Sequence, residues 1–167
     1  DGYMWRVELD LRMFFDSENH SKLFQLLSDR IEDGRVVSLI HKFLRAPICE
    51  EGKVGMPNTI GTPQGGVISP LLANILLHDL DEKLESKGVR AVRYVDDAVL
   101  FAKSRKAAER LLEWVTDFTE QKLFLKVNAE KTKILRIGDP DVQFLGFSFT
   151  SQVSKKRRES YPTSRYF

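Results

Sequence analysis

Residues 4–11 alternate between apolar and polar side chains, which is the two-residue period of a β-strand with one buried face. One side carries Trp5, Val7, Leu9 and Leu11, and the other carries Met4, Arg6, Glu8 and Asp10. The alternation predicts a half-buried strand with Asp10 on its polar face.

The next stretch, residues 23–44, has apolar side chains at the three- and four-residue spacing of amphipathic helices. Asp33-Gly34 interrupts this spacing, so we predict two helices with a break between them. Residues 47–62 contain several Gly and Pro residues among short alternating runs. We expect a loop or an irregular hairpin there.

Two longer helices are predicted later in the chain. Ser69-Pro70 is typical of a helix start, because Ser favours the N-cap and Pro favours the first helical position. A stripe of leucines follows, and Gly88 closes this helix. Ser104 can cap a second helix, which extends through Phe118.

Two acids interrupt the strand-like sequence between these helices. Residues 89–95 and 98–102 are predicted to be the arms of a β-hairpin, with Asp96 and Asp97 at its tip. Two more strands are expected near 133–137 and 141–149. This order of elements predicts an α+β fold in which helices cover one face of a sheet.

The composition is that of one globular domain. The chain has 167 residues, of which 42% are hydrophobic and 30% charged, which is enough for a substantial core. The net charge of +2 favours no class of partner by itself. The single cysteine, Cys49, excludes an internal disulfide and fits a reducing compartment, so we expect a cytoplasmic protein of a bacterial or organellar interior. No apolar run reaches the ~20 residues of a membrane span.

The adjacent acids Asp96 and Asp97 indicate metal chemistry. Neighbouring carboxylates repel each other, and a bound cation relieves the repulsion. Asp10 is a third carboxylate that can reach the same sheet edge, and three such oxygen ligands suit Mg²⁺. The alternative from these residues alone is a surface turn with two solvated acids, because short motifs often occur by chance.

Five sequence blocks resemble, in order, those of the reverse transcriptases and maturases encoded by group II introns. The blocks are LDLRMFFDSENH (9–20), GTPQGGVISPLLANILLHDLD (61–81), YVDD (94–97), VNAEKTKIL (127–135) and FLGF (144–147). Five blocks in this order are a much stronger signal than any one of them.

The resemblance implies the palm of a polymerase, an antiparallel sheet with helices packed on one face, together with part of the fingers. We expect residues 1–150 to form this palm with partial fingers, and residues 151–167 to be a basic connection toward a missing thumb. The chain starts without Met in a strand-like run. We therefore interpret it as a fragment of a longer protein and expect the isolated fragment to be inactive.

The resemblance also implies site residues. Two Mg²⁺ ions, for which Mn²⁺ can substitute, would be bound by Asp10, Leu11, Asp96 and Asp97, and the three aspartates would be catalytic. The incoming nucleotide would be contacted by Phe15, Gln64, Gly65 and Lys131, and the primer and template by Tyr94 and Gly146. Phe15 would exclude a ribose 2′-OH by its bulk, although a simple core position beside Phe14 is the alternative. Either Lys131 or Lys133 would lie near the triphosphate.

The resemblance implies an RNA-directed DNA polymerase that transfers dNTPs to a primer 3′-OH on an RNA template. The parent protein would also bind structured intron RNA and assist splicing and mobility. One alternative is the reverse transcriptase of a retron, a diversity-generating element, a CRISPR-linked system or a phage-defence system. The other is a non-catalytic RNA-binding maturase module. Three features depart from the usual pattern: Glu18 replaces an apolar residue, YVDD replaces YADD, and Arg12-Met13 is an unusual pair in the first acidic block.

Overall fold

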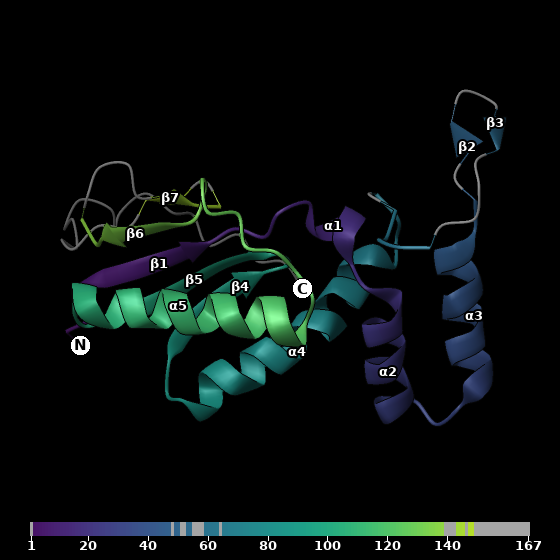
Figure 1. Ribbon diagram of the computed structural model, residues 1–167, viewed down its shortest axis with the longest axis horizontal. Coiled ribbons are helices and arrows are strands. Elements are labelled where there is room, and N and C mark those ends of the chain that lie inside the picture. Colours follow the sequence, from purple (N-terminus) through teal and green to yellow (C-terminus); the bar gives the residue numbers. More distant parts are fainter. Residues whose placement is uncertain are drawn as a thin grey trace, which may run out of the picture.

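The computed structural model describes residues 2–47, 49–50, 53–54, 59–63, 65–138, 143–145 and 147–148. Their centre is a four-stranded antiparallel sheet in the order β4-β5-β1-β6 (Figure 1). The strands are β1 (Trp5–Leu9), β4 (Arg90–Tyr94), β5 (Asp97–Ala102) and β6 (Lys133–Arg136). Because β1 pairs with both β5 and β6, the first strand of the sequence lies inside the sheet.

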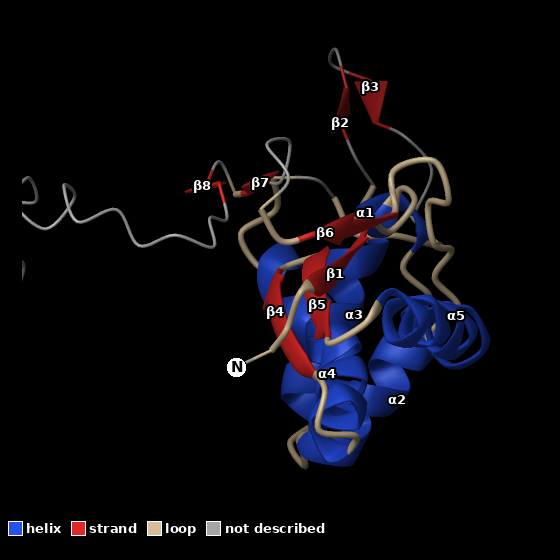
Figure 2. Cartoon of the chain, turned by 90° about the vertical axis from the view of Figure 1, so that its left-hand side faces the viewer, coloured by secondary structure: helices blue, strands red, loops and turns tan. Residues whose placement is uncertain are grey.

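Helices cover one face of this sheet. The described helices are α1 (Phe14–Ser17), α2 (His20–Arg30), α3 (Gly34–Arg45), α4 (Ser69–Ser86) and α5 (Arg105–Lys122). Of these, α4 and α5 make the main contacts with the sheet. α5 contacts β1, β5 and β6, whereas α4 contacts β4, and Figure 2 shows both helices on the same side of the sheet. α2 packs on α4, and α3 packs on α2 at the far end of the molecule (Figure 1). The predicted α+β architecture is confirmed.

The core lies between the sheet and these helices. Val7, Leu9 and Leu100 of the sheet are at most 3% exposed. The helices contribute the buried residues Leu72, Leu76, Leu77, Leu80, Ala108 and Val115. Burying each large aliphatic side chain stabilises the fold by about 1.5–3 kcal/mol. A slip of one residue would turn Val7 and Leu9 outward, so the core fixes the register of β1.

Several predicted helix boundaries are confirmed. Asp33 separates α2 from α3, and its side chain accepts a hydrogen bond from Arg35 N at 2.9 Å. Ser104 caps α5 by accepting a hydrogen bond from Ala107 N at 3.2 Å. Gly88 follows α4 with a φ of +66°, a left-handed conformation that glycine adopts without strain.

The prediction that Ser69 is an N-cap was wrong. α4 begins at Ser69 itself, after Ile68, and no side chain caps it. Ser69 Oγ instead donates a hydrogen bond to the carbonyl of Pro63 at 2.8 Å. Gly66 leaves the space for this contact, because a Cβ there would lie 2.6 Å from Ser69 Oγ. The Ser69 hydroxyl thus stabilises the loop that precedes α4 and does not cap the helix.

The prediction of an exposed polar face on β1 was also wrong at Arg6. Its side chain is completely buried and forms an ion pair with Glu8. Arg6 lies in the central strand, opposite Phe101 of β5 and Leu135 of β6. The alternation of β1 assigns Arg6 to the solvent face. In the sheet, however, large apolar side chains flank Arg6 on both sides.

The remaining strands are short. β2 (Cys49–Glu50) pairs with β3 (Lys53–Val54), which confirms a hairpin in residues 47–62. β7 (Gln143–Phe144) pairs with β8 (Phe147–Ser148), within the expected strand region 141–149. Within the ranges given above, no helix has both the length and the apolar character to cross a membrane.

Candidate active site

The ends of β1 and β5 bring two of the predicted acids to one cleft. Leu9, the last residue of β1, pairs with Ala98 near the start of β5. Asp10 and Asp97 are the adjacent residues at the same sheet edge. Both line a cleft of about 180 Å³, whose other lining residues include Lys131, Phe144 and Leu145. The register fixed by the core therefore sets two carboxylates into a common space.

The segment after α5 holds Asp10 in place. Asn128 N donates a hydrogen bond to the Asp10 carbonyl at 2.9 Å, and Asp10 N donates one to Thr132 Oγ1 at 3.2 Å. Lys131 Nζ, from the same segment, lies 3.9 Å from Asp10 Oδ2. Lys133 lies in β6 and does not line the cleft. Of the two candidate lysines, Lys131 is the one beside the acids.

The acids at this edge act on one another electrostatically. Burial raises the pKa of the Asp97 carboxyl, the charges of Asp96 and Asp10 raise it further, and Lys131 lowers it. A divalent cation would relieve this repulsion, and carboxylate oxygens are the ligands that Mg²⁺ prefers. The donor set therefore fits a hard cation.

The three aspartates share one sheet edge, but only two of them share the cleft. Asp96 is half-buried in the turn between β4 and β5 and does not line the space between Asp10 and Asp97. Among the described residues, no three acidic, histidine or cysteine side chains lie close enough together to hold a metal ion. Leu11 has a buried aliphatic side chain without a donor atom, so only its main-chain carbonyl could bind a metal.

The short helix α1, which follows β1, carries Phe15. The Phe15 carbonyl accepts a hydrogen bond from Thr62 N at 2.5 Å, and Gly61 N donates to the Glu18 carbonyl at 2.9 Å. His20 Nε2 donates to the Gly61 carbonyl at 2.6 Å, which gives this histidine a structural role. The turn after β1 is thus bonded to the segment that precedes α4.

Phe15 and Phe14 differ in burial. Phe14 is 2% exposed and belongs to the core, whereas Phe15 is half-buried and stands edge-to-face against it at 5.2 Å between ring centroids. The ring of Phe15 is therefore supported from behind and partly open to solvent. Phe15 also packs against the core and does not line the cleft of Asp10 and Asp97. Its contact with a nucleotide stays a prediction.

Glu18 is a buried carboxyl that no sequence motif assigns to the site. Its side chain has no exposed surface, and one oxygen accepts a hydrogen bond from the Thr62 hydroxyl. Burial raises its pKa to about 7, the Thr62 hydrogen bond opposes this, and the charge of Asp96 adds to the rise. Glu18 and Thr62 lie 44 positions apart, and no pattern in the sequence connects them.

We expect Glu18→Gln to stabilise the chain in a pH-dependent manner. Between the ordinary glutamate pKa of 4.5 and the folded value of about 7, the folded chain binds more protons than the unfolded chain. Its stability is therefore fully present below this window and falls as the pH rises through it. Because Gln has no charge to bury, the variant should gain about 3 kcal/mol at pH 8 and less than about 1 kcal/mol at pH 5.

Urea unfolding at both pH values measures this difference. Glu32→Gln is the matched control, since it removes the same charge from an exposed position between α2 and α3. An equal gain for Glu18→Gln at pH 5 and pH 8 would contradict the expected titration.

Of the other residues predicted to contact nucleotide, primer or template, the structure describes only Tyr94 and Gly65. Tyr94 is 62% exposed at the end of β4, and Gly65 is exposed with a φ of +81°. Gln64 and Gly146 lie outside the described residues, as does the basic segment 151–167. Their roles stay predictions.

Comparisons with known proteins agree on one family. A family model described as reverse transcriptase (RNA-dependent DNA polymerase) matches residues 1–149. Protein YkfC of Escherichia coli K12 is 30% identical over 96% of this chain and 49% of its own length. The group II intron-encoded protein LtrA of Lactococcus lactis is 28% identical over 87% of this chain and 35% of its own length. The chain thus spans half or less of these relatives.

Solved structures show the same fold. A telomerase from Candida tropicalis, in complex with a fragment of telomeric RNA, matches 99% of this chain and 32% of its own, with a TM-score of 0.70. The apo form of the enzyme from the same organism matches 81% of this chain with a TM-score of 0.65. Sequence identity is only 15% and 14%, so these matches speak for the fold alone.

Proposed function

The chain belongs to the reverse transcriptase family, and on this premise we propose that it is the catalytic palm of an RNA-directed DNA polymerase of the group II intron type. One observation carries the proposal. The strand register sets Asp10 and Asp97 into one cleft with Lys131. Acids that repel each other in a cleft are typical of catalytic sites, because a structural turn gains nothing from the repulsion.

Three aspartates would hold the metal ions. Asp10 and Asp97 would supply carboxylate oxygens from the cleft, Asp96 would supply its carboxylate from the adjoining turn, and Leu11 would supply its main-chain carbonyl. When bound, two Mg²⁺ or Mn²⁺ ions supply the positive charge that activates the primer 3′-oxygen and stabilises the leaving oxygen. The protein's own contribution is to fix the carboxylates on a rigid sheet edge before substrate arrives.

Lys131 would act on the leaving group. Its ammonium lies beside Asp10, on an exposed segment whose backbone is held by the Asn128 and Thr132 hydrogen bonds. A positive charge there attracts the triphosphate and stabilises the negative charge that develops on pyrophosphate. Lys131 Nζ also carries a proton that the leaving oxygen can take.

The partners follow from the family. An RNA template, a DNA primer and dNTPs are the proposed substrates. Structured intron RNA is a further proposed partner, because a relative that covers most of this chain is a group II intron-encoded protein. We propose the maturase role for the natural protein that contains this chain.

We expect that protein to extend a DNA primer on an RNA template with dNTPs, and Phe15→Val to admit ribonucleotides. A smaller side chain at the half-buried Phe15 leaves room for a 2′-OH. The preference for dNTPs over NTPs should fall roughly 10- to 100-fold, the range in which apolar pockets reject an added hydroxyl. Primer extension with matched dNTP and NTP series measures the preference.

Two controls complete this experiment. A chelator should abolish extension, and Mg²⁺ or Mn²⁺ should restore it. Phe24→Val changes a half-buried phenylalanine of α2 and should leave the preference unchanged. Absence of extension by the unsubstituted protein on RNA would overturn the proposed function, and an unchanged preference in Phe15→Val would overturn the role of Phe15.

A further inference from the structure

A single arginine joins the catalytic hairpin to α4. Arg93 Nε donates to Asp81 Oδ1 at 2.9 Å, and Arg93 Nη2 contacts the other oxygen of the same carboxylate. Arg93 Nη1 donates to Asn74 Oδ1 at 2.8 Å and to the Val95 carbonyl at 2.7 Å. Asn74 and Asp81 are two turns apart on α4. One guanidinium therefore links a helix, a strand and the turn that carries the catalytic acids.

The turn has a strained backbone at the residue that Arg93 contacts. Val95 has a φ of +57°, in the left-handed region that β-branched residues rarely adopt. Such a conformation costs about 1–3 kcal/mol and persists only when its surroundings hold it. Asp96 follows directly, so the conformation of Val95 sets the direction in which the two aspartates leave the turn.

The other end of the link is rigid. α4 places Leu72, Leu76, Leu77 and Leu80 in the core, each at most 1% exposed. The Arg93 side chain is only 12% exposed, and its planar group matches the Asp81 carboxylate in two-point geometry. Arg93 pairs with Ala98 in the sheet, whose buried side chain belongs to the helix-packed core. The Arg93 side chain therefore approaches the turn between β4 and β5 from the face of the sheet that the helices cover.

We propose that Arg93 and Asp81 are positioning residues, which hold the Val95 main chain so that Asp96 and Asp97 are presented to the substrate cleft. The inference rests on the proposed polymerase function. Arg93 does not touch the reacting atoms, and its effect is transmitted through the Val95 carbonyl. A misplacement of reacting groups by about 1 Å can cost on the order of 10²-fold in rate.

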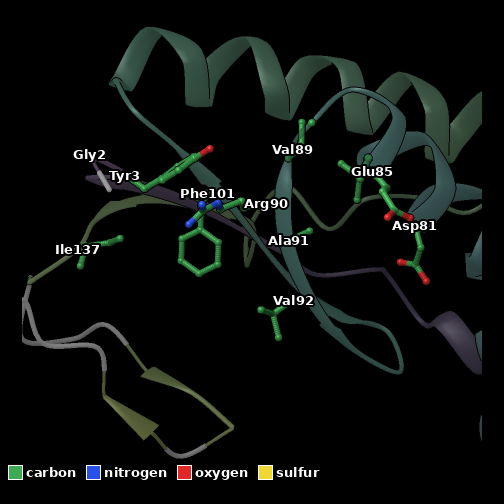
Figure 3. A pocket seen from close by; sticks show the side chains of 12 residues that line it. Gly2, Tyr3, Asp81, Glu85, Val89, Arg90, Ala91, Val92, Phe101 and Ile137 are labelled. Atoms are coloured by element: carbon green, nitrogen blue, oxygen red, sulfur yellow. The ribbon is translucent and has the colours of Figure 1, made fainter.

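Asp81 can be changed without disturbing the core. It lines an open cleft of about 860 Å³ between the C-terminal half of α4 and the outer edge of β4. Figure 3 shows Asp81 and Glu85 on α4, with Arg90 and Val92 on the neighbouring strand. The Asp81 side chain is 39% exposed, so Asp81→Asn leaves no buried cavity.

Three substitutions test the link. Arg93→Gln and Asp81→Asn each remove one charge of the pair, and Arg93→Lys keeps the charge but loses the planar fork that reaches three partners at once. Arg90→Gln is the control, because it removes the same charge from the same strand. Arg90 stands over the Tyr3 ring at 4.9 Å, at the end of β4 away from the catalytic turn.

The first readout is hydrogen exchange of the peptide that contains Val95, Asp96 and Asp97, in the 167-residue chain. We expect exchange at least ~10-fold faster in Arg93→Gln and Asp81→Asn, and unchanged exchange in Arg90→Gln, because the turn opens locally when its hold is lost. Unchanged exchange in both variants would overturn the inference.

The second readout is primer extension by the natural protein that contains this chain. Arg93→Gln should lower kcat on the order of 10²-fold, with a smaller change in KM for dNTP, and Arg93→Lys should recover part of the loss. A residue with a merely stabilising role would leave kcat unchanged below the unfolding temperature, and that result would also overturn the inference. If the unsubstituted protein does not extend primers, the proposed function fails, and the exchange data alone decide whether Arg93 holds the turn.

Discussion

Asp96→Asn and Asp97→Asn should each abolish DNA synthesis while the chain stays folded. The amide is nearly the same size as the carboxylate but offers no charge to a metal ion. Losing one metal ligand removes several kcal/mol of transition-state stabilisation, which corresponds to a fall in rate of about 10³-fold or more. Primer extension by the natural protein measures the loss.

The same substitutions should not weaken the fold. Burial and the charges of Asp96 and Asp10 raise the pKa of Asp97, so its ionised form is disfavoured in the folded chain. The neutral amide of Asp97→Asn removes this repulsion, and thermal unfolding should show equal or higher stability. Asp117→Asn, at an exposed position on α5, is the control for loss of charge alone. Normal extension by both Asp96→Asn and Asp97→Asn would remove the catalytic role of the pair.

Gly61→Ala should be the most destabilising of the substitutions considered. An added Cβ would lie 2.6 Å from the Phe15 carbonyl oxygen and 2.7 Å from that of Asp16. Both contacts are with backbone, which cannot rotate away as a side chain can. Gly61 also has a φ of +78°, which adds about 1–2 kcal/mol for an L-residue. We expect a total loss on the order of 3 kcal/mol in urea unfolding.

Gly65→Ala separates the two contributions to this loss. Gly65 has a φ of +81°, but an added Cβ there meets no atom within 4 Å. The control should therefore lose only the conformational part. Equal losses in the two variants would mean that the close approach of Gly61 to the Phe15 turn contributes nothing.

The elements whose apolar residues recur at a regular period could be predicted from the sequence. Alternation located β1, and leucine spacing located α4, because one buried face imposes a period on any strand or helix. The acids Asp10 and Asp97 could also be assigned to one sheet edge. Asp10 directly follows β1 and Asp97 is the first residue of β5. The last residue of one strand and the first residue of its antiparallel partner meet at the same end of the sheet.

Tertiary contacts decided what the sequence could not. Arg6 is buried because β1 became a central strand, and alternation does not report which strands flank it. Glu18 and Thr62, like Arg93 and Asp81, are ordinary polar residues until the fold brings them together. Their partners depend on how α4 and the turn after β1 lie against the sheet, which no local pattern encodes.

The hydrogen bond between Asp10 and Thr132 sets an order of events during protein synthesis. The two residues are 122 positions apart. At ~5–20 residues per second, about 6–24 seconds pass between their incorporation by the ribosome. For most of this interval, until residue 102 has been made, β1 has neither β5 nor β6 to pair with, and its apolar residues Val7 and Leu9 stay uncovered. The nascent strand is therefore exposed to aggregation, and a truncated chain that ends before Thr132 has no complete support for its first catalytic acid.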